Sequence, residues 1–133
     1  MIVVDDDLVF FDNLIESLMD KHRHVDANTI WTGWCQEMNL DGNGCFMYET
    51  SLRQNSTNEI PSFRYKFGSG SGTLYPPCMI QRFQDILDLI RLGDNIYHDE
   101  LVVKKISLDM GIKVGLCRNL KYKSNAGGWI THT

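Results

Sequence analysis

The sequence predicts an α+β domain with a largely antiparallel sheet and two amphipathic helices. Two segments repeat apolar residues at helical spacing, and several short segments rich in β-branched and aromatic residues are separated by turn signals. These elements follow one another as strand, helix, hairpin, strand, helix and strands, an order typical of an α+β fold. At 133 residues the chain is long enough for one domain with a real core and too short for two, so residues 1–133 are expected to form a single domain, complete or incomplete.

The first half of the chain is expected to hold a strand, a helix and a hairpin. Residues 2–4 predict a short buried strand, and the aspartates at 5–7 are N-cap candidates for an amphipathic helix over roughly 8–23. Segments 30–40 and 45–52 flank D-G-N-G, the strongest hairpin signal in the chain, whose glycines are expected to adopt positive φ. The apolar stripe of the helix consists of Phe11, Leu14, Ile15, Leu18 and Met19.

The second half is expected to hold one more helix and several strands. After an aromatic strand at 63–67 and a flexible Gly/Ser loop, Pro76 and Pro77 begin a helix for which Gly93 is the expected C-cap. The buried stripe of this helix is predicted to be Ile80, Phe83, Ile86, Leu87 and Ile90. Further strands are predicted at 101–109, 112–120 and 129–133.

Composition narrows the class of protein. The chain is 43% hydrophobic and 23% charged, as in ordinary globular proteins, and no apolar run approaches the roughly 20 residues that span a bilayer. Acidic residues stand where a signal peptide has a basic leader, so a cytoplasmic location and no membrane partner are expected. Reduced thiols are expected because no C-x-x-C pair occurs among Cys35, Cys45, Cys78 and Cys117.

Charge is distributed unevenly along the chain. The net charge of −4 combines an acidic first half with a basic second half. Generic nucleic-acid binding is disfavoured, because the overall charge repels a phosphate backbone. The basic excess predicts either solvated strand faces, the favoured interpretation, or a groove for a small carboxylate or phosphate ligand. Most of this excess comes from Lys104, Lys105, Lys113, Arg118, Lys121 and Lys123.

Two short motifs suggest a metal site. Asp41, Asn43 and Gly44 fit an EF-hand loop, but Thr50 stands where calcium requires a bidentate glutamate, so a hairpin turn without a cation is expected. The segment H-R-H-V-D places His22, His24 and Asp26 close together, yet residues two apart diverge on a helix. A solvated helix end is therefore the favoured interpretation of this segment.

A catalytic thiol is also disfavoured. Cys45 with the distant His132 would suggest a cysteine protease, but an activated thiol needs a helix N-terminus or a histidine partner. Cys45 instead opens the second arm of the predicted hairpin.

Four segments together resemble a known family. "IVVDDDLVFFDNLIESL", "PSFRYKF", "IKVGLCRNL" and "GGWITHT" are similar to pieces of the N-terminal portion of small iron(II)- and 2-oxoglutarate-dependent oxygenases of marine phages and bacteria. The resemblance implies a jelly-roll-like sheet and a metal triad of His, an Asp two residues later and a distal His. It also implies a downstream Arg or Lys that pairs with the co-substrate.

Only His132 matches a ligand of this triad. The Asp, the second His and the basic residue would all come after Thr133, so Fe(II) and 2-oxoglutarate are expected only if the chain were completed. This chain alone is expected to be inactive. His132 is expected at the end of a strand that lies among the strands at 101–108 and 113–120. Tight iron binding by this chain would instead direct attention to His22, His24, Asp26 and His98.

The alternative function is a small non-enzymatic interaction or structural protein of a phage or virus. Its binding surface would use exposed aromatic side chains (Trp31, Trp34 and Tyr65) or the basic second half, and its partner would be another protein or a second copy of this chain. The codons downstream of His132 distinguish the two functions. An Asp at the second position after His132 favours the oxygenase, and a stop directly after Thr133 favours the interaction protein.

Overall fold

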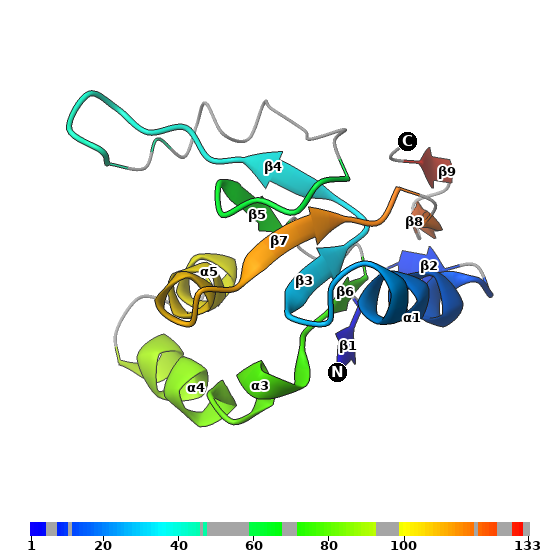
Figure 1. Ribbon diagram of the computed structural model, residues 1–133, viewed down its shortest axis with the longest axis horizontal. Coiled ribbons are helices and arrows are strands. Elements are labelled where there is room, and N and C mark those ends of the chain that lie inside the picture. The colour runs from blue at the N-terminus through cyan, green and yellow to red at the C-terminus, as the bar shows by residue number, and fades with distance from the viewer. Residues whose placement is uncertain are drawn as a thin grey trace.

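The computed structural model describes residues 1–4, 8–10, 12–45, 47, 59–67, 72–92, 99–118, 120–124 and 129–131. Within these residues the chain is α+β, as predicted, with helices on both sides of a central sheet (Figure 1). Three sheets are described, and all but one of their strand pairs are antiparallel.

The central sheet has four strands in the order β1-β6-β3-β7. The strands are β1 (Ile2–Val3), β6 (Thr73–Leu74), β3 (Thr29–Thr32) and β7 (Lys113–Leu116). β3 and β7 run parallel, so the sheet is mixed, and its edge strand β1 is partly exposed rather than buried as predicted. A parallel pair needs a long crossover connection, here the chain from residue 33 to residue 112.

Two smaller antiparallel sheets lie beside it. The first joins β2 (Leu8–Phe10), β8 (Lys121–Ser124) and β9 (Trp129–Thr131), and the second pairs β4 (Cys35–Glu37) with β5 (Tyr65–Phe67). The jelly-roll arrangement implied by the oxygenase resemblance is not confirmed by these strands.

The two faces of the central sheet carry separate cores. Because side chains alternate along a strand, Trp31 packs under helix α1 (Leu14–His24) while its neighbour Ile30 packs on the opposite face. The α1 core contains Leu18, Trp31, Leu74, Cys117 and Leu120. The opposite core is covered by α3 (Pro77–Ile80), α4 (Phe83–Arg91) and α5 (Asp99–Asp109), with Met79, Val103 and Ile106 among its buried residues (Figure 1).

The Trp31 ring restricts residue 115, its neighbour on β7, to glycine. It is fully buried, its Nε1 donates to the Asp26 carbonyl at 2.9 Å, and its register partner on β7 is Gly115. A Cβ on Gly115 would stand 2.5 Å from Cζ3 of Trp31. The indole therefore occupies the space that any side chain at residue 115 would need.

The predicted strand at 101–109 is wrong, since this segment is the helix α5. Its buried residues recur at helical spacing, and it ends in a Schellman motif around Gly111, whose φ is +70°. The Ile112 N–H donates to Ser107 O at 2.8 Å, and the Gly111 N–H donates to Leu108 O at 3.0 Å. The signal missed in the sequence was the glycine just after the segment, which is typical of a helix end.

The first helix also differs from its prediction. Residues 8–10 form β2, which pairs with β8, and α1 begins only at Leu14 after the N-cap residue Asn13. The predicted caps at 5–7, and Phe11 of the predicted stripe, lie outside the described residues. Within the stripe Leu18 is fully buried, whereas Ile15 is 63% exposed.

The second helix is broken into two. A turn at residues 81–82 separates α3 from α4 and changes the phase of the apolar positions. Met79 is consequently buried, whereas Ile80 and Leu87 of the predicted stripe are exposed. Phe83 does pack against the core, with its ring edge-to-face against Tyr75 at 5.8 Å.

The chain reverses at D-G-N-G as predicted. The Asp41 N–H donates to Cys45 O and the Met47 N–H donates to Asn39 O, both at 2.8 Å. Only one of the two glycines, Gly44, has a positive φ, which corrects the expectation for Gly42. Before the turn, β4 pairs with β5, and most of segment 45–52, its predicted partner, lies outside the described residues.

Candidate functional site

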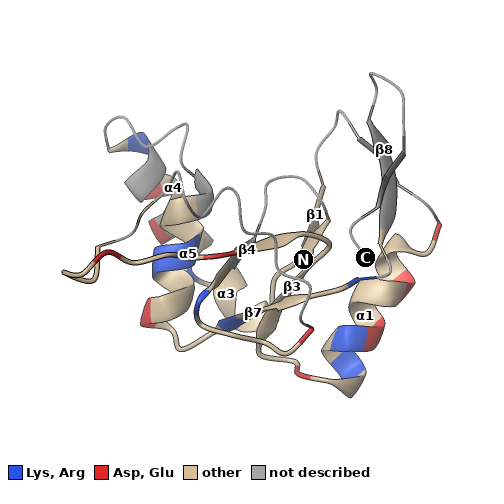
Figure 2. Cartoon of the chain, turned by 90° about the horizontal axis from the view of Figure 1, so that it is seen from above, with Lys and Arg blue, Asp and Glu red and all other residues tan. Residues whose placement is uncertain are grey.

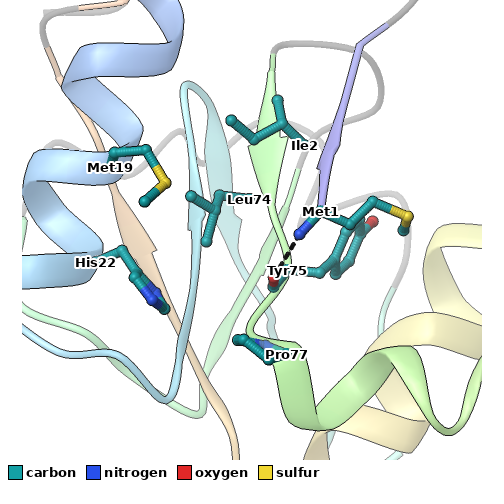
Figure 3. Close-up of a pocket in the computed structure, with 7 residues that line it drawn as sticks. All are labelled: Met1, Ile2, Met19, His22, Leu74, Tyr75 and Pro77. Carbon is teal, nitrogen blue, oxygen red and sulfur yellow. Dashed lines mark hydrogen bonds between the residues drawn. The ribbon is translucent and has the colours of Figure 1, made fainter.

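A pocket of about 380 Å³ lies between α1 and the edge of the central sheet (Figure 3). Met19 and His22 contribute from α1, Leu74 contributes from β6, and the start of α3 closes one end. The full lining is Met1, Ile2, Met19, His22, Leu74, Tyr75 and Pro77. Most of these residues have apolar side chains; the two with polar groups are His22 and Tyr75, and the Tyr75 side chain packs in the core on the opposite face of the sheet.

Local structure explains how these residues meet. Met19 and His22 are three residues apart, so they share one face of α1. Ile2 pairs with Leu74 in the sheet, and this ladder continues where the Tyr75 N–H donates to Met1 O at 2.8 Å. Pro77 follows at the first position of α3, where a proline fits a helix start.

His22 is a polar residue beside this pocket. Its Nδ1 is buried and has no hydrogen-bond partner among the described residues. A buried polar atom without a partner costs roughly 1–3 kcal/mol, so few such atoms occur in folded proteins. Figure 3 shows His22 and Met19 on the helix side of the pocket, facing Leu74 and Pro77. The mainly apolar lining suits an apolar guest.

Charged neighbours of His22 on α1 are engaged elsewhere. Lys21 lies 3.5 Å from Glu59 and stands over the Trp31 ring at 5.6 Å, and His24 lies 3.7 Å from Asp20. Acidic and basic positions lie side by side on this helix in Figure 2. The pocket wall itself contains no Asp, Glu, Lys or Arg side chain among the described residues.

The predicted histidine cluster does not come together as a metal site. His24 is exposed, and Asp26 uses its Oδ1 to accept the Asn28 N–H at 2.8 Å. Within the described part of the chain, no three His, Cys, Asp or Glu side chains are placed to hold a metal ion. His98 and His132 lie outside the described residues, so the structure does not test the iron ligand.

The strand that precedes His132 has different neighbours from those predicted. β9 pairs with β8, whereas segment 101–108 is part of α5. Residues 129–131 are a strand as predicted, but segment 101–108 is not a strand beside it. His132 itself lies outside the described residues.

The predicted basic cluster is divided between environments. Lys104 is only 2% exposed and donates to Phe63 O at 2.8 Å, so the prediction of a solvated strand face is wrong for this residue. Lys105 pairs with Asp109 on the surface of α5, and Lys113 stands over the Phe63 ring at 5.2 Å. Arg118 is half-buried, and the side chains of Lys121 and Lys123 in β8 are not among those described.

The aromatic surface expected of an interaction protein is also not formed. Trp31 is fully buried and Tyr65 is 9% exposed, while Trp34 is half-buried. Both Trp31 and Tyr65 belong to the cores because they lie on strands covered by helices or by a second sheet.

Asp41 and the cysteines have structural environments. The Asp41 Oδ1 accepts the N–H groups of Asn43 and Cys45 at 2.8 and 2.9 Å, which stabilises the turn. All four cysteines are free thiols, as expected. Cys35 and Cys117 are buried, and Cys45 and Cys78 are exposed.

Comparison with known proteins identifies no relative. No family model, characterised protein or solved structure matches this chain. Among the described helices, none has the length and apolar character that a membrane crossing requires.

Proposed function

We propose that this domain binds a small, largely apolar molecule in the pocket between α1 and the β1–β6 edge. The mainly apolar lining of this pocket carries the proposal. Like the alternative function predicted from the sequence, this is a non-enzymatic binding function. The proposed binding site is the pocket and not a surface of exposed aromatic side chains.

The size of the pocket suits such a guest. Its volume of about 380 Å³ falls within the range of roughly 300–1,000 Å³ that is typical of ligand sites. An apolar protein cavity of about 150 Å³ is already large enough to bind benzene. The pocket can therefore accept one or two rings, or a short branched chain.

Binding can be tested by NMR with toluene as an apolar probe. Toluene should shift the methyl resonances of Met19 and Leu74 saturably, because both line the pocket. Met19→Trp should abolish these shifts by filling the space, whereas Glu16→Trp, on an exposed position of α1, should not. Thermal melts would confirm that both variants fold. The proposal fails if toluene causes no saturable shift, or if both variants bind it like the wild type.

A second proposal retains the relationship to 2-oxoglutarate/Fe(II) oxygenases. It is favoured by one observation, namely that residues 129–131, directly before the expected ligand His132, form the strand β9. The described residues do not themselves fit an iron centre, since no three potential ligands lie together among them. Sequencing the gene beyond the codon for Thr133 tests this proposal. An Asp two residues after His132 and a later His would support it, and a stop codon there would refute it.

A further inference from the structure

We propose that the turn at Asp41–Gly44 is a site of spontaneous modification, at which the side-chain amide of Asn43 reacts with the backbone nitrogen of Gly44. The reaction forms a cyclic imide, which water then opens to aspartate or isoaspartate. It requires no enzyme and no cofactor, and it is independent of ligand binding in the pocket.

The turn contains the residue pair that this reaction needs. Asn43 is the only asparagine in the chain that is followed by glycine, and residues 41–45 are exposed. Ring closure brings the Gly44 nitrogen onto Cγ of Asn43, and a side chain on the following residue would obstruct this approach. A Cβ built at Gly44 would meet nothing within 4 Å among the described residues. The space beside this peptide bond is therefore open.

The reaction consumes only water. Hydroxide removes the N–H proton of Gly44, the nitrogen bonds to Cγ of Asn43, and the side-chain nitrogen leaves as ammonia. Water then adds to one of the two imide carbonyls and breaks its C–N bond. Opening at Cγ gives aspartate, and opening at the main-chain carbonyl gives isoaspartate, whose main chain is one carbon longer. Either product adds one negative charge to a chain whose net charge is −4.

One hydrogen bond of the turn opposes the attack. The Gly44 N–H donates to Asp41 O at 3.0 Å, so this bond must open before the proton is removed. A single intramolecular hydrogen bond adds little net stability, because water replaces it when it opens. Asn43 should therefore react roughly 2- to 10-fold more slowly in the folded chain than in the chain unfolded in guanidinium chloride.

The preceding pair, Asp41-Gly42, should be protected in the folded chain. An aspartate before a glycine can form the same imide by loss of water. The Oδ1 atom of Asp41, however, accepts the N–H groups of Asn43 and Cys45 at 2.8 and 2.9 Å, which fixes this carboxylate within the turn. A carboxylate is also a poorer electrophile than an amide. Isomerisation at Asp41 should consequently appear only in the unfolded chain.

Asn28 is a matched internal control. Asn28 and Asn43 are both exposed, and each donates its N–H to Oδ1 of the aspartate two residues earlier at 2.8 Å. The two sites differ in the residue that follows. Thr29 is β-branched and buried in β3, so its nitrogen is hindered where that of Gly44 is not. Asn28 should therefore remain unmodified while Asn43 reacts.

Incubation of the whole chain at mildly alkaline pH, followed by peptide mapping with mass spectrometry, tests the proposal. The acidic products should accumulate at Asn43, with Asn28 and Asp41 unchanged in the folded chain. Asn43→Gln should give no product at this position, because glutamine would have to close a less favourable six-membered ring. Asn28→Gln should react at Asn43 like the wild type, and thermal melts check that both variants fold.

The mapping of the wild type decides the proposal without either variant. If Asn43 reacts no faster than Asn28 in the folded chain, the proposal is wrong. Equal accumulation of acidic product at position 43 in Asn43→Gln would also overturn it, because the product would then not arise from the asparagine. Isomerisation of Asp41 at the same rate in the folded and the unfolded chain would overturn the selectivity for Asn43 that the turn hydrogen bonds provide.

Discussion

Replacement of Lys104 by methionine should change how the stability of the domain depends on pH. Burial disfavours the charged ammonium and lowers the pKa of Lys104 to about 8 from its usual 10.5, although the electrostatic effect of Cys35 acts in the opposite direction. Below about pH 8 the amine is protonated in the folded and the unfolded chain alike. Between about pH 8 and 10.5 the unfolded chain still holds a proton that the folded chain has released, so stability rises with pH.

The size of this effect follows from the two pKa values. Each pKa unit corresponds to about 1.4 kcal/mol, so the shift from 10.5 to about 8 gives a total of roughly 3 kcal/mol. Most of it, roughly 2–3 kcal/mol, should be gained between pH 7 and pH 10. Lys104→Met has no amine to titrate, so this contribution to the pH dependence should be missing from the variant.

Urea unfolding at pH 7, 8, 9 and 10 measures the effect, with the free energy of unfolding compared between wild type and variant. Other groups titrate in both proteins and largely cancel in the difference. Lys105→Met is the matched control, because the Lys105 side chain is 69% exposed on the same helix. As pH rises from 7 to 10, the free energy of unfolding of the wild type should increase by roughly 2–3 kcal/mol relative to that of Lys104→Met. A difference that is the same at every pH, as expected for Lys105→Met, would refute the buried-amine explanation.

The packing of the two cores leads to two further predictions. Gly115→Ala should destabilise the domain by about 1–3 kcal/mol or more, because the added Cβ would meet the Trp31 ring. The control Gly42→Ala, whose Cβ would have nothing within 4 Å, should change stability by less than about 0.5 kcal/mol. Equal urea midpoints for the two variants would contradict the packing of Trp31 against Gly115. Met79→Ala should cost about 2–5 kcal/mol because Met79 is fully buried, whereas Leu87→Ala should cost less because Leu87 is 44% exposed. A larger loss of unfolding free energy for Leu87→Ala than for Met79→Ala in the same assay would instead support the buried helix stripe predicted from the sequence.

Local signals in the sequence are sufficient for some elements and misleading for others. The turn at 41–44 is predictable because its Asp, Asn and Gly residues determine its hydrogen bonds within five residues. The helix at 99–109 is harder to predict, because its valines and isoleucine favour a strand when considered alone and only Gly111 after it indicates a helix end. Burial of Val103 and Ile106 against the sheet outweighs that preference, and such packing depends on residues distant in the sequence.

The parallel pairing of β3 with β7 cannot be predicted from the sequence either. It brings Trp31 beside Gly115, which is more than eighty positions away in the chain. A glycine inside a strand can indicate a close approach of another group. The sequence does not say which group approaches, so the pairing cannot be derived from it.

The pocket depends on a local signal that admits two interpretations. His22 stands four residues after Leu18 and three after Met19, so it continues the apolar stripe of α1 by one turn. The expectation of a solvated helix end gives weight to the neighbouring charges of Lys21, Arg23 and His24 and not to this spacing. A histidine that continues an apolar stripe points toward the core, where its ring nitrogens must find partners. The sheet beneath α1 offers Nδ1 no such partner among the described residues, because β1 and β6 present Ile2 and Leu74 at this point. The helix and the sheet edge together thus leave the buried Nδ1 of His22 without a described partner beside a mainly apolar pocket, and neither feature follows from the spacing along α1 alone.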